Sequence, residues 1–253
     1  MLRGDAGVLA PFWDAYGPVL DRQVQPGRIV VLPEALRTLP KAAADEAAGA
    51  LARLAHARGA TIVAGFIVDQ GGIRTNRAVV ASADGMIAWY DKQHLVPATE
   101  GAISPGRMPL LIDVQGVRAG IAICKDMHFA SLGRDYGARG ARLMIVPASD
   151  FGTDAWMASR MTALRGVENG YAIARSARQG LMTVSDRYGR ILAEGASEPE
   201  VTTLVARLPA ASDEAPTMFA RYGGVTDWLW VGFAALLLWQ LRRSGSNLPA
   251  DRK

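Results

Sequence analysis

Residues 28–34, Arg-Ile-Val-Val-Leu-Pro-Glu, decide the fold class, because they form a continuous apolar run that ends at a carboxylate. An apolar run of this length, bounded by glycine and proline, predicts a buried strand. Residues 40–58 follow as an alanine-rich segment with apolar positions at helical spacing, and Gly59 is a helix stop. A second apolar run at 61–68 predicts the next strand. The order strand, helix, strand indicates an α/β domain.

The alternation of strands and helices continues on both sides of this stretch. Residues 9–23 predict an amphipathic helix, and the turns at Asp84-Gly85 and Gln115-Gly116 predict two hairpins. The remaining elements are helices at 129–140 and 154–169, and strands at 76–83, 86–91, 110–114, 117–124, 142–147, 171–176, 181–185, 191–194 and 201–208. Hairpins combined with strand–helix alternation predict two packed sheets with helices outside them.

Composition limits the classes of function. The 253 residues are 50% hydrophobic and 21% charged, which suits a chain with a well-buried core. The net charge is +4, but the arginines are scattered, so we expect no nucleic-acid partner. The single cysteine excludes an intramolecular disulfide and a multi-cysteine metal centre. Three separated histidines do not favour a histidine-rich metal site, so we expect neither a metal nor a cofactor.

The C-terminal segment differs from the rest of the chain. Residues 228–241 carry no charged side chain, and Trp228, Trp230 and Trp239 lie near the two ends of the run, where interfacial aromatics belong. We expect a transmembrane helix at 225–241, at the short limit for spanning a bilayer. A linker at 209–224 would precede this helix, and a cytoplasmic tail at 242–253 would follow it. The alternative is a buried or interfacial terminal helix.

Three reactive side chains stand at the ends of predicted strands. Glu34 follows the first apolar run, Lys92 follows the strand at 86–91, and Cys124 ends the strand at 117–124. Each has an ordinary alternative: a helix cap, a solvated lysine and a small buried thiol. Together they supply a nucleophile, a base for its proton and a cation for an oxyanion. We expect Lys92, Lys125 and the following helix N-terminus to favour the thiolate.

In this order, Glu34, Lys92 and Cys124 resemble the Glu-Lys-Cys triad of the nitrilase (carbon–nitrogen hydrolase) superfamily. Residues 91–97, Asp-Lys-Gln-His-Leu-Val-Pro, with Glu100, are similar to the lysine motif and second glutamate of that superfamily. The resemblance implies a four-layer α-β-β-α sandwich over roughly residues 28–208. It also implies that Glu34 is the general base, that Lys92 steadies the oxyanion and that Cys124 carries the acyl group. Glu100 would assist the lysine and the incoming amine.

More narrowly, two segments resemble apolipoprotein N-acyltransferases. Residues 156–170, Trp-Met-Ala-Ser-Arg-Met-Thr-Ala-Leu-Arg-Gly-Val-Glu-Asn-Gly, look like their helix after the nucleophile. Residues 217–223, Thr-Met-Phe-Ala-Arg-Tyr-Gly, are similar to their entry into the last membrane span. We therefore expect Trp156, Asp126 and His128 beside the substrate. Trp156 as a core residue, and His128 as a supporting or surface residue, are the alternatives.

Two departures separate the chain from those acyltransferases. They usually carry Cys-Tyr-Glu at the nucleophile, whereas Cys124-Lys-Asp126 stands here and is closer to the soluble amidases. They also carry several membrane helices before the catalytic domain. Here we expect a catalytic domain at 1–208 that lacks its first strand, and the N-terminus does not resemble a signal peptide. We infer a truncated form, or a subunit whose membrane helices lie on another chain.

The favoured function is acyl transfer from a phospholipid to the amino terminus of a lipoprotein through a Cys124 thioester. Arg242 and Arg243 predict a cytoplasmic C-terminus, which would place the catalytic domain on the periplasmic side of a bacterial inner membrane. The first alternative is hydrolysis of a small amide or nitrile by the same thiol. The second alternative is an inactive remnant.

Overall fold

The computed structural model describes residues 7–197, 202–208 and 216–245. Its helices and strands alternate along the chain as the apolar pattern predicts. The helical elements are α1 (Ala10–Gln23), α2 (Lys41–Arg58), α3 (Pro97–Glu100), the 3-10 helix η1 (Cys124–His128), α4 (Ala130–Ala138), α5 (Ala155–Asn169) and α6 (Met218–Gly245). The strands are β1 (Ile29–Val31), β2 (Thr38–Pro40), β3 (Thr61–Gln70), β4 (Ile73–Ala81), β5 (Ile87–Asp91), β6 (Leu110–Val114), β7 (Val117–Ile121), β8 (Leu143–Ser149), β9 (Ala172–Arg178), β10 (Leu181–Ser185) and β11 (Ile191–Ala196).

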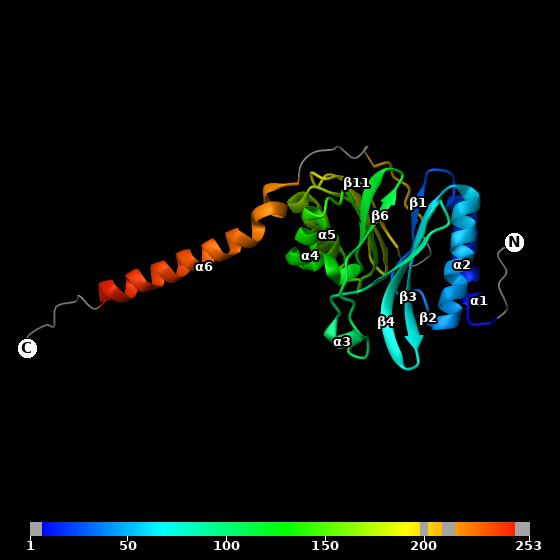
Figure 1. Cartoon of the computed structure of the whole chain (residues 1–253), viewed down its shortest axis with the longest axis horizontal. Coiled ribbons are helices and arrows are strands. Elements are labelled where there is room, and N and C mark those ends of the chain that lie inside the picture. The colour runs from blue at the N-terminus through cyan, green and yellow to red at the C-terminus, as the bar shows by residue number, and fades with distance from the viewer. Residues whose placement is uncertain (1–6, 198–201, 209–215, 246–253) are drawn as a thin grey trace, which may run out of the picture.

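The strands of the described residues form two sheets that face each other (Figure 1). The first sheet has the order β1-β3-β4-β5, with β2 beside β3, and the second has the order β11-β10-β9-β8-β7-β6. Strand β1 is parallel to β3, and β8 is parallel to both β7 and β9. The predicted hairpins β4–β5 and β6–β7 are antiparallel pairs as expected.

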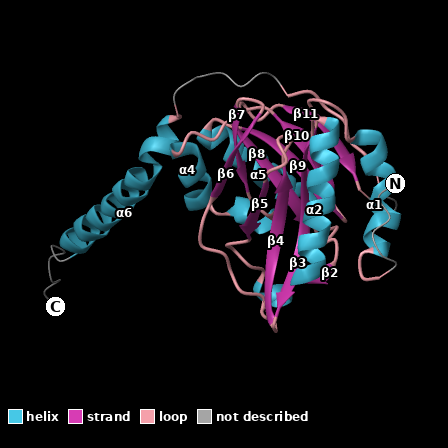
Figure 2. Ribbon diagram, turned by 45° about the vertical axis from the view of Figure 1, so that its right-hand side comes forward, coloured by secondary structure: helices cyan, strands magenta, loops and turns pink. Residues whose placement is uncertain are grey.

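Helices cover the outer face of each sheet, which confirms the four-layer α-β-β-α sandwich. In Figure 2, α1 and α2 lie beside the first sheet, and α4 and α5 lie on the far side of the second. The alternation of side chains along β3 shows why: Ile62 and Phe66 pack in the cluster that holds α1 and α2, whereas Val63 packs between the sheets. Strand β8 does the same, with Ile145 between the sheets and Met144 beneath α4. Buried strands with two apolar faces therefore build both interfaces.

Helix α6 extends away from the sandwich (Figure 1). Its first residues are anchored, because the Thr217 hydroxyl bonds to the carbonyl oxygen of Glu168, and the Arg134 guanidinium lies 5.4 Å from the Phe219 ring centroid. The apolar residues beyond this anchor are exposed, so the alternative of a helix buried in the domain is wrong. The span Met218–Arg243 has 26 residues and a mean hydropathy of 1.3, which makes it long and apolar enough to cross a membrane.

Some boundaries differ from the prediction. Helix α6 begins at Met218, inside the segment predicted as a linker, and part of that linker (209–215) and of the tail (246–253) lies outside the described residues. The strand predicted at 201–208 is wrong: residues 202–208 have no regular secondary structure, and residue 201 is not described. Its apolar side chains suggested burial, but a strand also needs a neighbour for its backbone bonds. Only Leu208 of this segment packs against the core between the sheets.

Candidate active site

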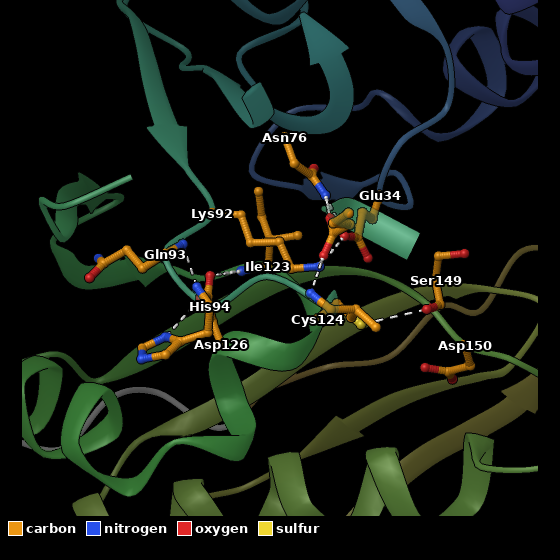
Figure 3. A network of polar contacts seen from close by, with 12 residues as sticks. Glu34, Asn76, Lys92, Gln93, His94, Ile123, Cys124, Asp126, Ser149 and Asp150 are labelled. Atoms are coloured by element: carbon orange, nitrogen blue, oxygen red, sulfur yellow. Dashed lines mark hydrogen bonds and ion pairs between the residues drawn. The ribbon is translucent and has the colours of Figure 1, made fainter. Parts of the chain in front are cut away.

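Glu34, Lys92 and Cys124 come from both sheets to one place (Figure 3), where Glu100 contacts Lys92. Glu34 follows β1, Lys92 follows β5, Glu100 ends α3, and Cys124 follows β7 as the first residue of η1. The Lys92 Nζ atom lies 2.7 Å from Oε1 of Glu34 and 2.8 Å from Oε2 of Glu100. Glu34, Lys92 and Glu100 are 4%, 2% and 8% exposed, so this ion cluster is removed from water. Buried charges of this kind persist only when they are paired and hydrogen-bonded.

Asn76 of β4 bridges the two carboxylates. Its Nδ2 atom donates to Oε1 of Glu34 at 2.7 Å and to Oε1 of Glu100 at 2.6 Å. The amide nitrogen of Val96 donates a further bond to Oε2 of Glu100 at 2.7 Å. Both carboxylates are therefore oriented by neutral donors in addition to Lys92.

The backbone around Glu34 is held by two close contacts. The Glu34 amide donates to the carbonyl oxygen of Ala148 on β8 at 3.2 Å, which links the two sheets directly. On the other side lies Gly65 of β3, where an added Cβ would stand 2.6 Å from Cα of Glu34 and 2.8 Å from the carbonyl oxygen of Pro33. Only glycine at this position lets the chain that carries Glu34 approach β3 so closely.

Cys124 has a backbone conformation that is uncommon for a residue with a side chain. Its φ angle is +46°, in the left-handed region, and its Sγ atom lies 3.5 Å from the carbonyl oxygen of Ser149, to which the thiol donates. Such conformations cost free energy and are found at functional sites. The sharp turn at the end of β7 thus sets the direction of the thiol.

Burial and neighbouring charges set the protonation states of the site. Burial, followed by the field of Glu34, raises the pKa of the Cys124 thiol to about 12, although Lys92 opposes the shift. Lys92 thus favours the thiolate as expected, but burial and the charge of Glu34 outweigh it, so the net shift of the thiol pKa is upward. A 3-10 helix, rather than an α-helix, starts at the cysteine. The thiol rests in its neutral form and needs a base to react.

Glu34 is the candidate for that base. Burial raises the pKa of Glu34 above its ordinary value, with Lys92 working in the opposite direction. Burial also acts to lower the pKa of Lys92, but the fields of Glu34 and Cys124 outweigh it and raise the pKa. For Glu100, burial acts upward, yet the hydrogen bond and charge of Lys92 bring its pKa below the ordinary value. The site thus combines a glutamate and a lysine whose pKa values are raised with a second glutamate whose pKa is lowered.

Asp126 lies behind the site and is fully buried. Its Oδ2 atom accepts from the Tyr90 hydroxyl at 2.7 Å and from the Ile123 amide at 3.0 Å, and its Oδ1 atom accepts from the His94 amide at 2.8 Å. The His94 ring stacks on Phe129 at 3.8 Å between centroids. With both oxygens occupied, Asp126 joins the Cys124 turn to the loop after Lys92. We therefore assign it a positioning role in place of the expected contact with substrate.

Trp156 and His128 are less closely tied to the cluster. Trp156 is 62% exposed on α5, with the Arg160 guanidinium 5.4 Å from its ring centroid, so the alternative of a core tryptophan is wrong. His128 ends η1 and is partly buried, and burial followed by the charge of Arg175 lowers its pKa. Contact of either residue with a substrate stays a prediction.

Sequence reasoning missed two features of the site, Asn76 and a buried ion pair between Asp150 and Arg175. Nη1 of Arg175 lies 3.0 Å from Oδ2 of Asp150, and both residues are 3% exposed. Asp150 follows the apolar strand β8 directly, as Glu34 follows β1, so the same strand-end signal was available. Asn76 also carried a signal, because asparagine is depleted inside strands. Among the described residues, no group of three or more His, Cys, Asp or Glu side chains could hold a metal ion.

The sequence model of the carbon–nitrogen hydrolase family matches residues 10–215. A Mycobacterium tuberculosis protein described as a hydrolase is 33% identical over 138 residues, covering 48% of this chain and 49% of that protein. The apolipoprotein N-acyltransferase of Geobacter metallireducens is 29% identical over 189 residues, covering 64% of this chain and 35% of that enzyme. The chain thus spans about half of the first relative and about a third of the second.

Among solved structures, the fold is similar to an amidase from Nesterenkonia sp. AN1. A mutant of that amidase, with acrylamide added at its active-site cysteine, superposes with a TM-score of 0.63 at 25% identity. The similarity covers 80% of this chain and 87% of the amidase.

Proposed function

Because the chain belongs to the carbon–nitrogen hydrolase family, we propose that it is a thiol enzyme whose Cys124 attacks an acyl carbon and forms a thioester. One observation supports this proposal most strongly, the buried cluster of Glu34, Lys92 and Glu100 at the place where Cys124 ends its strand. A cluster of three buried charges is difficult to explain by stability alone. It is explained by the need for a base and an oxyanion donor in a site without water.

In the first half-reaction, Glu34 takes the proton of the Cys124 thiol as sulfur attacks the acyl carbonyl carbon. Lys92 donates a hydrogen bond to the oxygen, on which negative charge develops. The carbon–oxygen bond to the leaving alcohol then breaks, and the alcohol receives the proton from Glu34. The thioester remains on Cys124, and Glu34 is again a carboxylate.

In the second half-reaction, an amine attacks the thioester and Glu34 accepts a proton from its nitrogen. The carbon–sulfur bond breaks, and the Cys124 sulfur recovers the proton. Glu100 holds Lys92 in place during both steps through its 2.8 Å contact with Nζ. Water in place of the amine would turn the same sequence into hydrolysis.

We propose acyl transfer as the overall reaction, with a phospholipid as the donor and the amino terminus of a lipoprotein as the acceptor. The similarity to the acyltransferase of Geobacter metallireducens and the exposed apolar helix α6 support it. Arg242 and Arg243 at the end of α6 favour a cytoplasmic C-terminus, with the sandwich on the periplasmic side of an inner membrane.

The alternative function is hydrolysis of a small amide or nitrile. The similarity to an amidase over most of its length, and the presence of Asp126 after the nucleophile, favour this alternative. Both functions use the same thioester and differ in the acyl donor and in the group that releases the acyl chain.

Intact-mass measurement of the full chain, isolated from membranes, distinguishes the acyltransferase, the amidase and the inactive remnant. A fatty-acyl mass on the wild type that is absent from Cys124→Ala supports the transferase. Turnover of short amides with no acyl adduct from phospholipid supports the amidase. If neither an adduct nor amide turnover is observed, the chain is an inactive remnant.

Cys124→Ser is expected to lose nearly all activity, because a serine hydroxyl is harder to deprotonate than a thiol. Retention of more than about a few per cent of the rate would contradict thiol catalysis.

A further inference from the structure

The end of β8 contacts the segments that carry both Glu34 and Cys124. The carbonyl oxygen of Ala148 accepts the Glu34 amide at 3.2 Å. The carbonyl oxygen of Ser149, the next residue, accepts the Cys124 thiol at 3.5 Å. Figure 3 shows the thiol directed at Ser149, with Asp150 beside it. The position of these two carbonyl groups therefore sets how the sulfur lies relative to the carboxylate of Glu34.

Asp150, which follows these carbonyl groups directly, is fixed by a buried ion pair with Arg175 of β9. Nη1 of Arg175 donates to Oδ2 of Asp150 at 3.0 Å and Nη2 donates to Oδ1, so the contact is bidentate. Both side chains are 1% exposed. Nη1 also donates to the carbonyl oxygen of Leu181 at 2.7 Å. The arginine thus ties the end of β8 to β9 and to the first residue of β10.

The turn between β9 and β10 closes over the Asp150 carboxylate. The Leu181 amide donates to Oδ2 of Asp150 at 3.3 Å, and the Asp150 amide donates to the carbonyl oxygen of Arg178 at 2.9 Å. At Gly180 an added Cβ would stand 1.9 Å from Oδ2 of Asp150, so the carboxylate occupies the space that this glycine leaves open. Asp150 is therefore held both by its backbone and by its side chain.

Stability is not a sufficient reason for a buried ion pair at this place. Replacement of such a pair by apolar side chains of similar volume is often neutral or stabilising. A bidentate contact between Arg175 and Asp150 instead restricts both distance and direction, because two nitrogens must face two oxygens. Apolar side chains would fill the same space without this restriction. The pair is thus best explained by the position that it gives to the end of β8.

The pair also places charge near the thiol. The field of Arg175 acts to lower the pKa of Cys124, although burial, the first cause, raises that pKa overall. A carboxylate at the same place acts in the opposite direction, because a nearby negative charge disfavours the thiolate. Substitution of Arg175 and substitution of Asp150 should therefore change the reactivity of the thiol in opposite directions.

We propose that Asp150 and Arg175 are positioning residues for the reaction of Cys124. They hold the end of β8 so that Ser149 retains the thiol and Ala148 retains the backbone of Glu34, at the separation that proton transfer requires. This role rests on the thioester chemistry proposed above. Neither Asp150 nor Arg175 forms or breaks a bond in the reaction.

The first test uses Gly180→Ala in the full chain in detergent, because this variant displaces the Asp150 carboxylate without removing a charge. The kcat for thioester formation should fall by about tenfold or more, whereas KM should change by less than about twofold. Gly17→Ala, with no atom within 4 Å of the new Cβ, is the matched control and should keep full activity. A rise in KM with an unchanged kcat would contradict a positioning role.

The second test measures alkylation of Cys124, the single cysteine of the chain, by iodoacetamide. Asp150→Asn leaves the cation of Arg175 without its counter-ion, so alkylation at pH 8 should become faster by about threefold or more. Arg175→Met removes the cation and should slow alkylation. Arg175→Lys keeps the charge but loses the bidentate contact, so it should be alkylated like the wild type and still show a reduced kcat.

The direction of these changes decides the outcome. If the pair only stabilised the fold, the losses in Asp150→Asn and Arg175→Met would loosen the same packing and change alkylation in the same direction, which would overturn the proposal. Urea unfolding checks that each variant folds, and Arg175→Lys provides the comparison if Arg175→Met does not. Alkylation requires no substrate. Opposite changes in a protein that forms no thioester with any donor would therefore contradict the proposed function and leave the positioning of the thiol supported.

Discussion

The hydroxyl of Tyr90 donates a 2.7 Å hydrogen bond to Oδ2 of Asp126. Tyr90 lies on β5, two residues before Lys92, and Asp126 lies in the turn that begins at Cys124. The bond thus connects the first sheet to the second at the place where the reacting groups meet. Asp126 also binds the amides of Ile123 and His94, so one carboxylate fixes both segments.

The first prediction concerns Asp126→Asn. The new amide group would face donors, which leaves at least one buried donor unpaired and lowers the free energy of unfolding by about 1–3 kcal/mol. Urea unfolding monitored by tryptophan fluorescence measures this loss, and the rate of thioester formation should fall with it. Tyr90→Phe removes one donor and keeps the carboxylate, so its effect should be smaller. An unchanged unfolding midpoint in Asp126→Asn would show that Asp126 does not hold the site together.

The second prediction concerns Gly65→Ala. The added Cβ would stand 2.6 Å from Cα of Glu34, so the backbone that carries the base must move. A displacement of about 1 Å at a catalytic group can reduce the rate by about 100-fold. Steady-state kinetics measure this loss, and circular dichroism checks that the sheets remain. Gly17→Ala, in α1 with no atom within 4 Å of the new Cβ, should keep full activity. Full activity in Gly65→Ala would refute the close approach.

The third prediction concerns Asn76→Ala, which removes a hydrogen bond from each carboxylate. The Asn76 amide lowers the pKa of Glu34, so its loss should raise that pKa further. Glu34 must be ionised to act as a base, so the acidic limb of the pH–rate profile should move to higher pH. Thr75→Ala, at the neighbouring position on β4, serves as the control and should leave the limb in place. A fall in rate with no movement of the limb would argue for a purely structural role of Asn76.

The fourth prediction concerns the thiol of Cys124, whose pKa is raised by burial to about 12 from the ordinary 9.0. Alkylation by iodoacetamide should therefore keep rising above pH 9.0 without reaching a plateau there. The free energy of unfolding depends on pH through the same shift in the pKa of the thiol. The unfolded chain releases this proton near pH 9.0 and the folded chain retains it until about 12, so the contribution is complete below pH 9.0 and is lost as the pH rises toward 12.

The difference in unfolding free energy between the wild type and Cys124→Ala isolates this contribution from that of other groups. It should decrease between pH 9.0 and 12. A plateau of alkylation below pH 8, with no such decrease, would indicate a thiolate in the resting enzyme and would mean that Lys92 outweighs the effect of burial.

Most of the fold follows from the distribution of apolar residues. The runs at 28–33 and 61–68 are buried on both faces, so their apolar side chains identify them without tertiary information. Strand β2 was missed because its three residues form too short a pattern. The strand predicted at 201–208 was wrong for a different reason. Their pattern describes which side chains avoid water, but a strand exists only where another backbone lies beside it.

The site was predictable where one strand end carried one reactive side chain, as for Glu34 and Lys92. It was not predictable where the role depends on partners distant in sequence, as for Asn76. The protonation state of Cys124 belongs to this second class. The sequence shows a lysine beside the cysteine, whereas the dominant influence on the pKa is burial, which arises from the packing of the two sheets.

The bond between the Glu34 amide and the Ala148 carbonyl has a wider consequence, because the proposed base, Glu34, and the proposed nucleophile, Cys124, belong to different sheets of the sandwich. The gap between proton donor and proton acceptor is therefore the separation of the two sheets. A methyl group removed from the interface, as in Ile145→Val, would let that separation relax by a fraction of an ångström while the protein stays folded. The catalytic rate should therefore depend on how tightly the core between the sheets is packed. It should fall in a variant whose melting temperature has not yet changed.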